Sequence, residues 1–125
     1  MINIPDGSAM LLNVLACAAH ENAVAHGFYE DHFALREKVE GSAFAVDEAE
    51  RTFILAQIAK ISGECGEAVS AIQHGEPVKE VATELADVVI RTLDLGGYLG
   101  VEMGDIIIEK MKHNETRPYK HGKVC

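Results

Sequence analysis

The chain has 125 residues, a formal net charge of −9 at pH 7 and 48% hydrophobic residues. Its length predicts one domain spanning residues 1–125, and its apolar content excludes a disordered chain. The sequence has no long charge-free apolar run and no secretion signal, and it is strongly acidic, so we expect a cytoplasmic protein that binds neither membranes nor nucleic acid.

The first helix is predicted over residues 8–26. Its apolar face runs down the segment to a glycine, Gly27, which is well placed to end it, and Asp6 or Ser8 is the candidate cap. Residues 27–47 then mix aromatic and charged side chains. Here we expect a short helix at about 31–38 within a connection long enough to act as a functional loop or lid.

Two long helices follow, at about 47–73 and 78–99, separated by the break His74-Gly75-Glu76-Pro77. In each, apolar residues recur at steps of three and four, which predicts a continuous buried stripe. The stripes consist of Ile54, Ile58, Ile61, Cys65, Ala68 and Ile72, and of Val81, Leu85, Val88, Thr92, Leu95 and Leu99. We expect Gly96, Gly97 and Gly100 to loosen the end of the second of these helices.

A fourth long helix is predicted at about 103–114, with Ile107 and Met111 facing inward, and the polar end at 116–125 is expected to be a flexible tail. The sequence shows no strand pattern, so the predicted fold is an all-α bundle of four to five helices with its core at about 8–115. The long helices are also apolar away from their stripes, as at Leu55 and Val69. Such helices must be covered on more than one side, which predicts that the chain oligomerises through its helices.

Basic residues gather at the C-terminal end. Five of the eleven lysines and arginines lie there, namely Lys110, Lys112, Arg117, Lys120 and Lys123. An acidic body with a basic end could hold a polyphosphate, whereas the simpler interpretation is a solvated tail. The cysteines, Cys17, Cys65 and Cys125, lack metal-ligand spacing, and their odd number fits a reducing compartment.

Two pairs of carboxylates, Glu64/Glu67 and Glu84/Asp87, carry the clearest chemical signal. A spacing of three puts both members of a pair on one edge of a helix, so two antiparallel helices could pool four carboxylates. Like charges repel unless a cation lies among them, and an all-oxygen set suits Mg²⁺ or Mn²⁺. Glu64, Glu67 and Glu84 have no basic residue at i+4 on their own helix, whereas Arg91 and Asp94 follow Asp87 along the same edge at helical spacing and are expected to support the cluster. A di-iron site is disfavoured because its Glu-x-x-His pairs are missing.

These residues also form a recognisable pattern. Gly63-Glu64-Cys65-Gly66-Glu67, sixteen further residues and then Glu84-Leu85-Ala86-Asp87 resemble the signature of the MazG-like all-α nucleoside triphosphate pyrophosphohydrolases. The C-terminal segment with Lys110, Asn114 and Arg117 is similar to the ending of many members. His20-Glu21-Asn22 and Gly27-Phe28 resemble the substrate side of smaller ones. The similarity spans about 10–123, and Gly63 stands where the family usually has its first glutamate.

The resemblance implies a Mg²⁺-dependent hydrolase, with Mn²⁺ as a substitute, that converts an NTP or dNTP to the monophosphate and pyrophosphate in nucleotide-pool housecleaning. It implies that the catalytic residues and metal ligands are Glu64, Glu67, Glu84 and Asp87. It implies substrate contacts from Lys110, Asn114, Arg117, His20, Asn22 and Phe28. Lys60, one turn before Glu64, is a weaker candidate, and a salt bridge to Glu64 is the alternative. The resemblance also implies a homodimer or homotetramer.

Other interpretations stay open. A related dUTPase or phosphoribosyl-ATP pyrophosphohydrolase would keep the metal site and change the base pocket. The bundle could also bind nucleotide as a non-catalytic regulator, or be purely structural. Aromatic residues such as Phe28 and Tyr29 are found more often in a protein core than in a base-stacking site. The sequence does not identify the base, the sugar or the number of metal ions.

Overall fold

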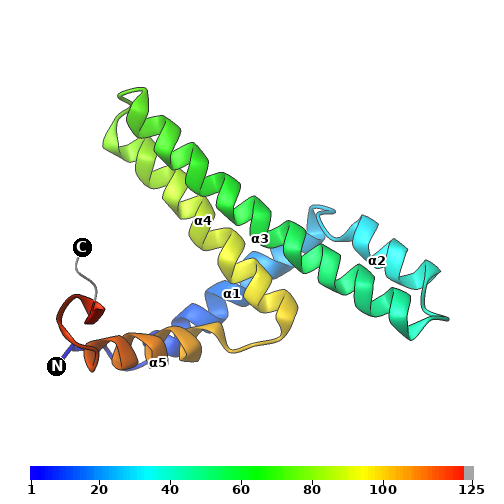
Figure 1. Cartoon of the computed structure of the whole chain (residues 1–125), viewed down its shortest axis with the longest axis horizontal. Helices are drawn as coiled ribbons and strands as arrows, with labels where there is room; N and C mark the ends of the chain where they lie inside the picture. Colours follow the sequence, from blue (N-terminus) through cyan, green and yellow to red (C-terminus); the bar gives the residue numbers. More distant parts are fainter. Residues whose placement is uncertain (123–125) are drawn as a thin grey trace.

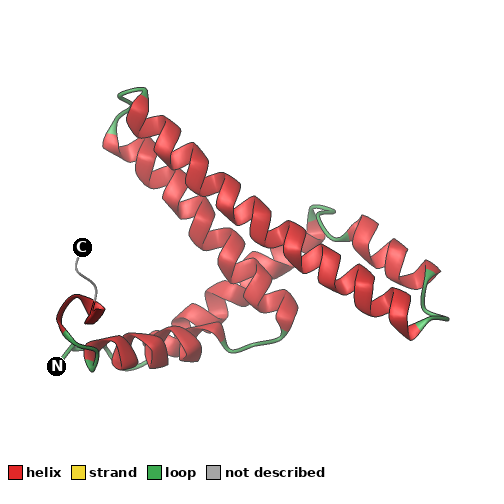
Figure 2. Cartoon of the chain, viewed as in Figure 1, coloured by secondary structure: helices red, strands yellow, loops and turns green. Residues whose placement is uncertain are grey.

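The computed structural model describes residues 1–122, which are mainly helical (Figures 1 and 2). Its elements are α1 Ser8–Ala25, α2 Glu30–Lys38, α3 Ala43–Gln73, α4 Val78–Leu99, α5 Met103–Glu115 and the 3-10 helix η1 Tyr119–Gly122. Within this range there is no strand, which confirms the all-α prediction and the short helix near 31–38. No helix of the described residues is long and apolar enough to cross a membrane. Lys123 and Cys125 of the predicted tail lie outside the described residues.

Most helices begin and end near the glycine and proline residues that were predicted to bound them. Gly27 and Gly100 adopt positive φ angles, +82° and +69°, just after α1 and at the end of α4. The start of α3 lies four residues earlier than expected because the Ser42 hydroxyl accepts a hydrogen bond from the backbone N–H of Ala45 at 3.2 Å. Neither Asp6 nor Ser8 caps α1, since Gly7 occupies the cap and the Ser8 hydroxyl donates to the carbonyl oxygen of Pro5.

α3 and α4 form a long antiparallel hairpin around which the other helices are placed (Figure 1). α2 folds back along the N-terminal half of α3, while α1 crosses α4 and also packs against α5. The closed end of the hairpin extends beyond the other helices. The structure is therefore open, and much of the hairpin is covered by no other part of the described chain.

Two glycines allow α1 to approach its neighbours closely. A Cβ added to Gly97 of α4 would lie 2.7 Å from the Cβ of His20, and one added to Gly104 of α5 would lie 2.0 Å from the backbone oxygen of Ala9. Gly96 and Gly97, which were expected to loosen the end of α4, lie inside a helix with the predicted bounds, Val78–Leu99, and provide space for the residues packed against it.

The core within one chain is small. Among the described residues, the buried hydrophobic side chains are Ala16, Ala23, Tyr29, Ala68, Ala71, Leu93 and Leu95. The predicted stripes are only partly buried, since Ala68 and Leu95 are covered whereas Ile58, Ile72 and Leu85 are at least half exposed. Met111, expected to face inward, is 44% exposed. The long helices are apolar on several sides, so hydrophobicity alone did not identify the side that packs within the chain.

Gly104→Ala should destabilise the fold, because the new methyl group would overlap the Ala9 backbone where α1 packs against α5. We expect a loss of about 1–3 kcal/mol in urea unfolding. The matched control is Gly66→Ala inside α3, where an added Cβ has no neighbour within 4 Å, and it should gain about 0.5–1 kcal/mol. Equal effects of the two variants on stability would contradict this account of the contact between α1 and α5.

Candidate functional site

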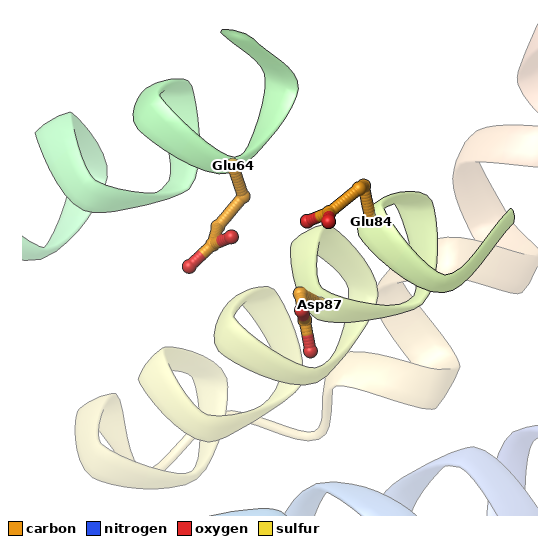
Figure 3. A group of neighbouring side chains, drawn as sticks. All are labelled: Glu64, Glu84 and Asp87. Carbon is orange, nitrogen blue, oxygen red and sulfur yellow. The ribbon is translucent and has the colours of Figure 1, made fainter. Parts of the chain in front are cut away.

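Three of the four predicted acidic residues meet between α3 and α4. Glu64 extends from α3 towards α4, Glu84 points towards Glu64, and Asp87 lies one turn further along α4 (Figure 3). All three are half-buried, and each offers a carboxylate oxygen within 4.8 Å of the others. The small buried residues Ala68 and Ala71 of α3 permit this close helix packing.

Glu67, the fourth residue, is exposed on the rim of this group. A hydrogen bond donated by the protonated Glu84 carboxyl to Glu67 raises the pKa of Glu84 above its usual value, and burial adds to the shift. The negative charges of Glu67, Asp87 and Glu64 act in the same direction. We call Glu64, Glu67, Glu84 and Asp87 the carboxylate cluster.

The cation that pairs with the carboxylate cluster is Arg91. Its Nε donates to Glu64 Oε1 at 2.5 Å, and the two side chains are 41% and 12% exposed, respectively. Among the described residues, Arg91 rather than Lys60 forms the ion pair with Glu64. Arg91 was expected to support the carboxylate cluster from its place on the same edge of α4 as Glu84 and Asp87, and its ion pair reaches across from α4 to Glu64 of α3.

Beside the carboxylate cluster lies a pocket of about 230 Å³, which we call the polar pocket. It is formed between α1, the turn after α1, α3 and α4. Its lining includes three predicted substrate residues, Asn22, Phe28 and Lys60, together with Glu64, Asp87, Arg91 and Asp94. The fold thus brings together residues more than sixty positions apart in the sequence.

A larger pocket of about 670 Å³ lies between α2 and α3 and is mainly apolar. Four rings line this apolar pocket, those of Phe28, His32, Phe44 and Phe53. It shares Phe28, Gln57 and Lys60 with the polar pocket, so the two adjoin. Phe28 is 68% exposed and is therefore not a core residue, whereas its neighbour Tyr29 is fully buried. In the sequence, the aromatic residues of segment 27–47 indicated a functional region here. Phe53 and Gln57, which also line the pocket, were not among the predicted site residues.

Behind the polar pocket, Asp94 is fixed by two partners. Its Oδ1 accepts a hydrogen bond from the Tyr29 hydroxyl at 2.7 Å and lies 2.9 Å from His20 Nδ1. Burial, and then the hydrogen bond to Asp94, raise the pKa of Tyr29 well above its usual value. His20, a predicted substrate residue, does not line the polar pocket in the part of the chain that the structure describes. Its observed role is to join α1 to α4.

A second polar network supports the wall of the apolar pocket. The Tyr98 hydroxyl donates to Glu50 at 2.6 Å and lies 2.8 Å from His32 Nε2. Burial and the hydrogen bond to Glu50 raise the pKa of Tyr98 to about 12. The buried His32 ring stacks on Phe53 with ring centroids 3.9 Å apart. These contacts give the pocket wall a defined shape before any ligand binds.

Lys110, Asn114 and Arg117 lie elsewhere in the chain. Lys110 and Asn114 belong to α5, which packs mainly on α1, and Arg117 follows that helix. Within residues 1–122, none of the three lines the polar or the apolar pocket. Within one copy of the chain, Lys110, Asn114 and Arg117 therefore lie away from the two pockets beside the carboxylate cluster.

The raised pKa of Glu84 predicts a pH-dependent stability. Above about pH 4.3 a glutamate in the unfolded chain loses its proton, whereas Glu84 in the folded chain still holds one. The proton on Glu84 therefore stabilises the fold at low pH, and this stabilisation is lost as the pH rises through the folded pKa of Glu84. Glu84→Gln cannot ionise, and it should gain stability relative to wild type between about pH 4 and pH 7.

Urea unfolding in EDTA at several pH values would measure this difference, with Glu109→Gln on the exposed side of α5 as the control. A stability difference that does not change with pH would contradict the assigned repulsion.

Comparisons of the chain with protein-family models, with curated protein sequences and with solved structures returned no match.

Proposed function

We propose that the chain is a Mg²⁺-dependent nucleoside triphosphate pyrophosphohydrolase, which converts an NTP or dNTP to the monophosphate and pyrophosphate. One observation carries the proposal: carboxylates from two helices border a pocket that also contains cationic side chains and adjoins an apolar pocket. A nucleoside triphosphate has the matching parts, a polyanionic chain at one end and a planar base at the other.

The donor set supports a hard divalent cation. The oxygens of Glu64, Glu84 and Asp87 lie within 4.8 Å of one another, and opposite oxygens around an octahedral Mg²⁺ lie about 4.2 Å apart. Glu67 at the rim is the fourth candidate ligand. Bound Mg²⁺, or Mn²⁺ in its place, would neutralise phosphate oxygens and align the attacking and leaving groups.

The side chains of the polar pocket then have distinct tasks. Arg91 and Lys60 would offset the charge that grows on the leaving pyrophosphate. Glu67, which is exposed, would orient a water. The water oxygen attacks the α-phosphorus, the bond to the bridging oxygen of the β-phosphate breaks, and pyrophosphate leaves with the electron pair. The proton of the water passes to a carboxylate.

The adjoining pockets suggest how the substrate lies. The phosphates would occupy the polar pocket, and the base would reach the rings of Phe28, Phe44 and Phe53 in the apolar pocket. A dUTPase or phosphoribosyl-ATP pyrophosphohydrolase would use the same carboxylates and differ in the apolar pocket, so a nucleotide panel separates these activities. Assembly into a homodimer or homotetramer in the cytoplasm belongs to the same proposal.

Glu67→Gln should lower pyrophosphate release by about 10²–10³-fold, because the amide is a poor metal ligand and no base. The assay compares a panel of canonical and modified nucleoside triphosphates in Mg²⁺ and in EDTA, with Glu109→Gln as the matched control. Unchanged release by Glu67→Gln would remove the assignment of the carboxylate cluster. Binding without turnover would identify a non-catalytic nucleotide-binding protein.

Phe28→Ala tests the placement of the base. Phe28 borders both pockets and is 68% exposed, so its removal should weaken substrate binding rather than the fold. Stacking worth about 1–3 kcal/mol per base corresponds to a rise in KM of roughly 5- to 150-fold. Tyr119→Ala, which removes an 88% exposed ring on η1, is the matched control. An unchanged KM would place the base elsewhere.

A further inference from the structure

Asp94 lines the polar pocket but takes no part in the proposed reaction. It continues the polar edge of α4, on which Glu84, Asp87, Arg91 and Asp94 follow one another at steps of three and four. Within residues 1–122, the carboxylates whose oxygens come within 4.8 Å of one another are Glu64, Glu84 and Asp87, not Asp94. Asp94 lies roughly 10 Å along the helix from Asp87, towards the crossing with α1 (Figure 1). We therefore do not count it among the metal ligands.

The two carboxylate oxygens of Asp94 have different surroundings. The Tyr29 hydroxyl donates to Oδ1 at 2.7 Å, and His20 Nδ1 lies 2.9 Å from the same oxygen. An ionised carboxylate can only accept, so His20 Nδ1 is a donor as well. Within residues 1–122, Oδ2 has no hydrogen-bond partner and is not one of the buried polar atoms that lack one. Because Asp94 lines the polar pocket and is 15% exposed, Oδ2 is open to that pocket.

The direction of Oδ2 is set by the protein before any ligand binds. Asp94 comes from α4, His20 from α1, and Tyr29 from the start of α2, so three elements hold one carboxylate. The Tyr29 side chain is 1% exposed, and its ring meets the His20 ring edge to face with centroids 4.8 Å apart. An acceptor that is already ordered discriminates between ligands without a further cost in conformational entropy.

A carboxylate oxygen restricts what can lie beside it. It repels phosphate oxygens, which carry the same charge, and it accepts only from a hydroxyl or an N–H group. With the phosphates of a nucleotide beside Arg91 and Lys60, and its base at Phe28, the part in between is the sugar. The hydrogen-bond donors of a nucleotide sugar are its hydroxyl groups. Asn22 of α1 lines the same pocket, and its amide can donate to the oxygen of such a hydroxyl.

We propose, on the basis of the function proposed above, that Asp94 determines the specificity for the sugar: its Oδ2 accepts a hydrogen bond from the 3′-hydroxyl of the bound nucleoside triphosphate. Ribose and deoxyribose both carry this hydroxyl, so the substrate class includes NTPs and dNTPs. Nucleotides that lack the 3′-hydroxyl lose the hydrogen bond. Nucleotides with a 3′-phosphate are rejected, because they would bring a further anion against the Asp94 carboxylate.

The first test uses the wild-type chain in Mg²⁺. It compares the deoxynucleoside triphosphates of A, C, G and T with their 2′,3′-dideoxy counterparts, which lack only the 3′-hydroxyl. Loss of a hydrogen bond to a charged acceptor should lower kcat/KM by about 10- to 100-fold within each pair. Equal kcat/KM values within every pair would overturn the proposal.

Variants of Asp94 test whether this residue is the acceptor. In Asp94→Ala both substrates of a pair should react at the same low kcat/KM, because the acceptor is gone. Asp94→Asn keeps the shape of the side chain and removes its charge, so the dideoxy penalty should fall below about tenfold. Asp47→Ala on α3, at an exposed aspartate that lines neither pocket, is the matched control and should retain the wild-type penalty.

Tyr29→Phe separates recognition of the hydroxyl from support of the fold. Asp94→Ala also leaves the Tyr29 hydroxyl and His20 Nδ1 without their partner, which lowers stability. Tyr29→Phe breaks the same network but keeps the Asp94 carboxylate, so the dideoxy penalty should persist. A penalty that is lost in Tyr29→Phe and kept in Asp94→Asn would overturn the proposal.

Calorimetric binding distinguishes a failure of this assignment from a failure of the proposed function. If the chain binds these nucleotides without turnover, the Kd values of each pair should show the same ratios as those expected for kcat/KM. Turnover or binding that does not depend on the 3′-hydroxyl would overturn the role of Asp94 alone. No turnover and no binding of any of these nucleotides in Mg²⁺ would overturn the proposed function and the role of Asp94 with it.

Discussion

The close packing of α3 against α4 is the contact on which the other features depend. It uses alanines, Ala68 and Ala71, so the helix axes can approach and the longer acidic side chains beside them meet across the gap. The same register turns exposed apolar side chains, such as Val69 of α3 and Leu85 of α4, away from the acidic ones. A change in this packing would therefore act on the candidate metal site and on this exposed apolar side of the hairpin together.

The crossing of α1 completes the polar pocket. Gly97 lets α1 lie directly on α4, and the His20–Asp94–Tyr29 hydrogen bonds hold the two helices and the start of α2 in one arrangement. Asn22 and Phe28 reach the polar pocket only because of this crossing. Buried polar contacts of this kind cost stability unless each group is paired, and here they define one position of the helix.

Much of the architecture follows from local sequence. The glycine and proline punctuation predicted where most helices end, and the spacing of Glu64, Glu84 and Asp87 predicted that carboxylates from two helices could meet. Helix periodicity depends on residues three and four positions apart, so it can be read from the sequence alone. These parts need no knowledge of the tertiary structure.

The rest depends on contacts between distant segments. The Arg91–Glu64 ion pair joins two helices, and no rule for spacing along one helix can find it. The aromatic lining of the apolar pocket combines Phe44 and Phe53 with Phe28 only after α2 folds back on α3. The prediction of which apolar residues are buried was partly wrong for a related reason. When several sides of a helix are apolar, the inner side is decided by fit, as where Ala71 rather than Ile72 is buried.

Gly63 is a position at which the number of acidic side chains beside the carboxylate cluster can change. It lies inside α3 one residue before Glu64, and a Cβ placed there would have no neighbour within 4 Å. A glutamate at this position would add a further carboxylate beside Glu64, and a glycine codon can become a glutamate codon through one nucleotide substitution. The number of acidic side chains in the cluster can therefore increase or decrease without repacking the hairpin. Single mutations can in this way change the density of negative charge on this side of the hairpin.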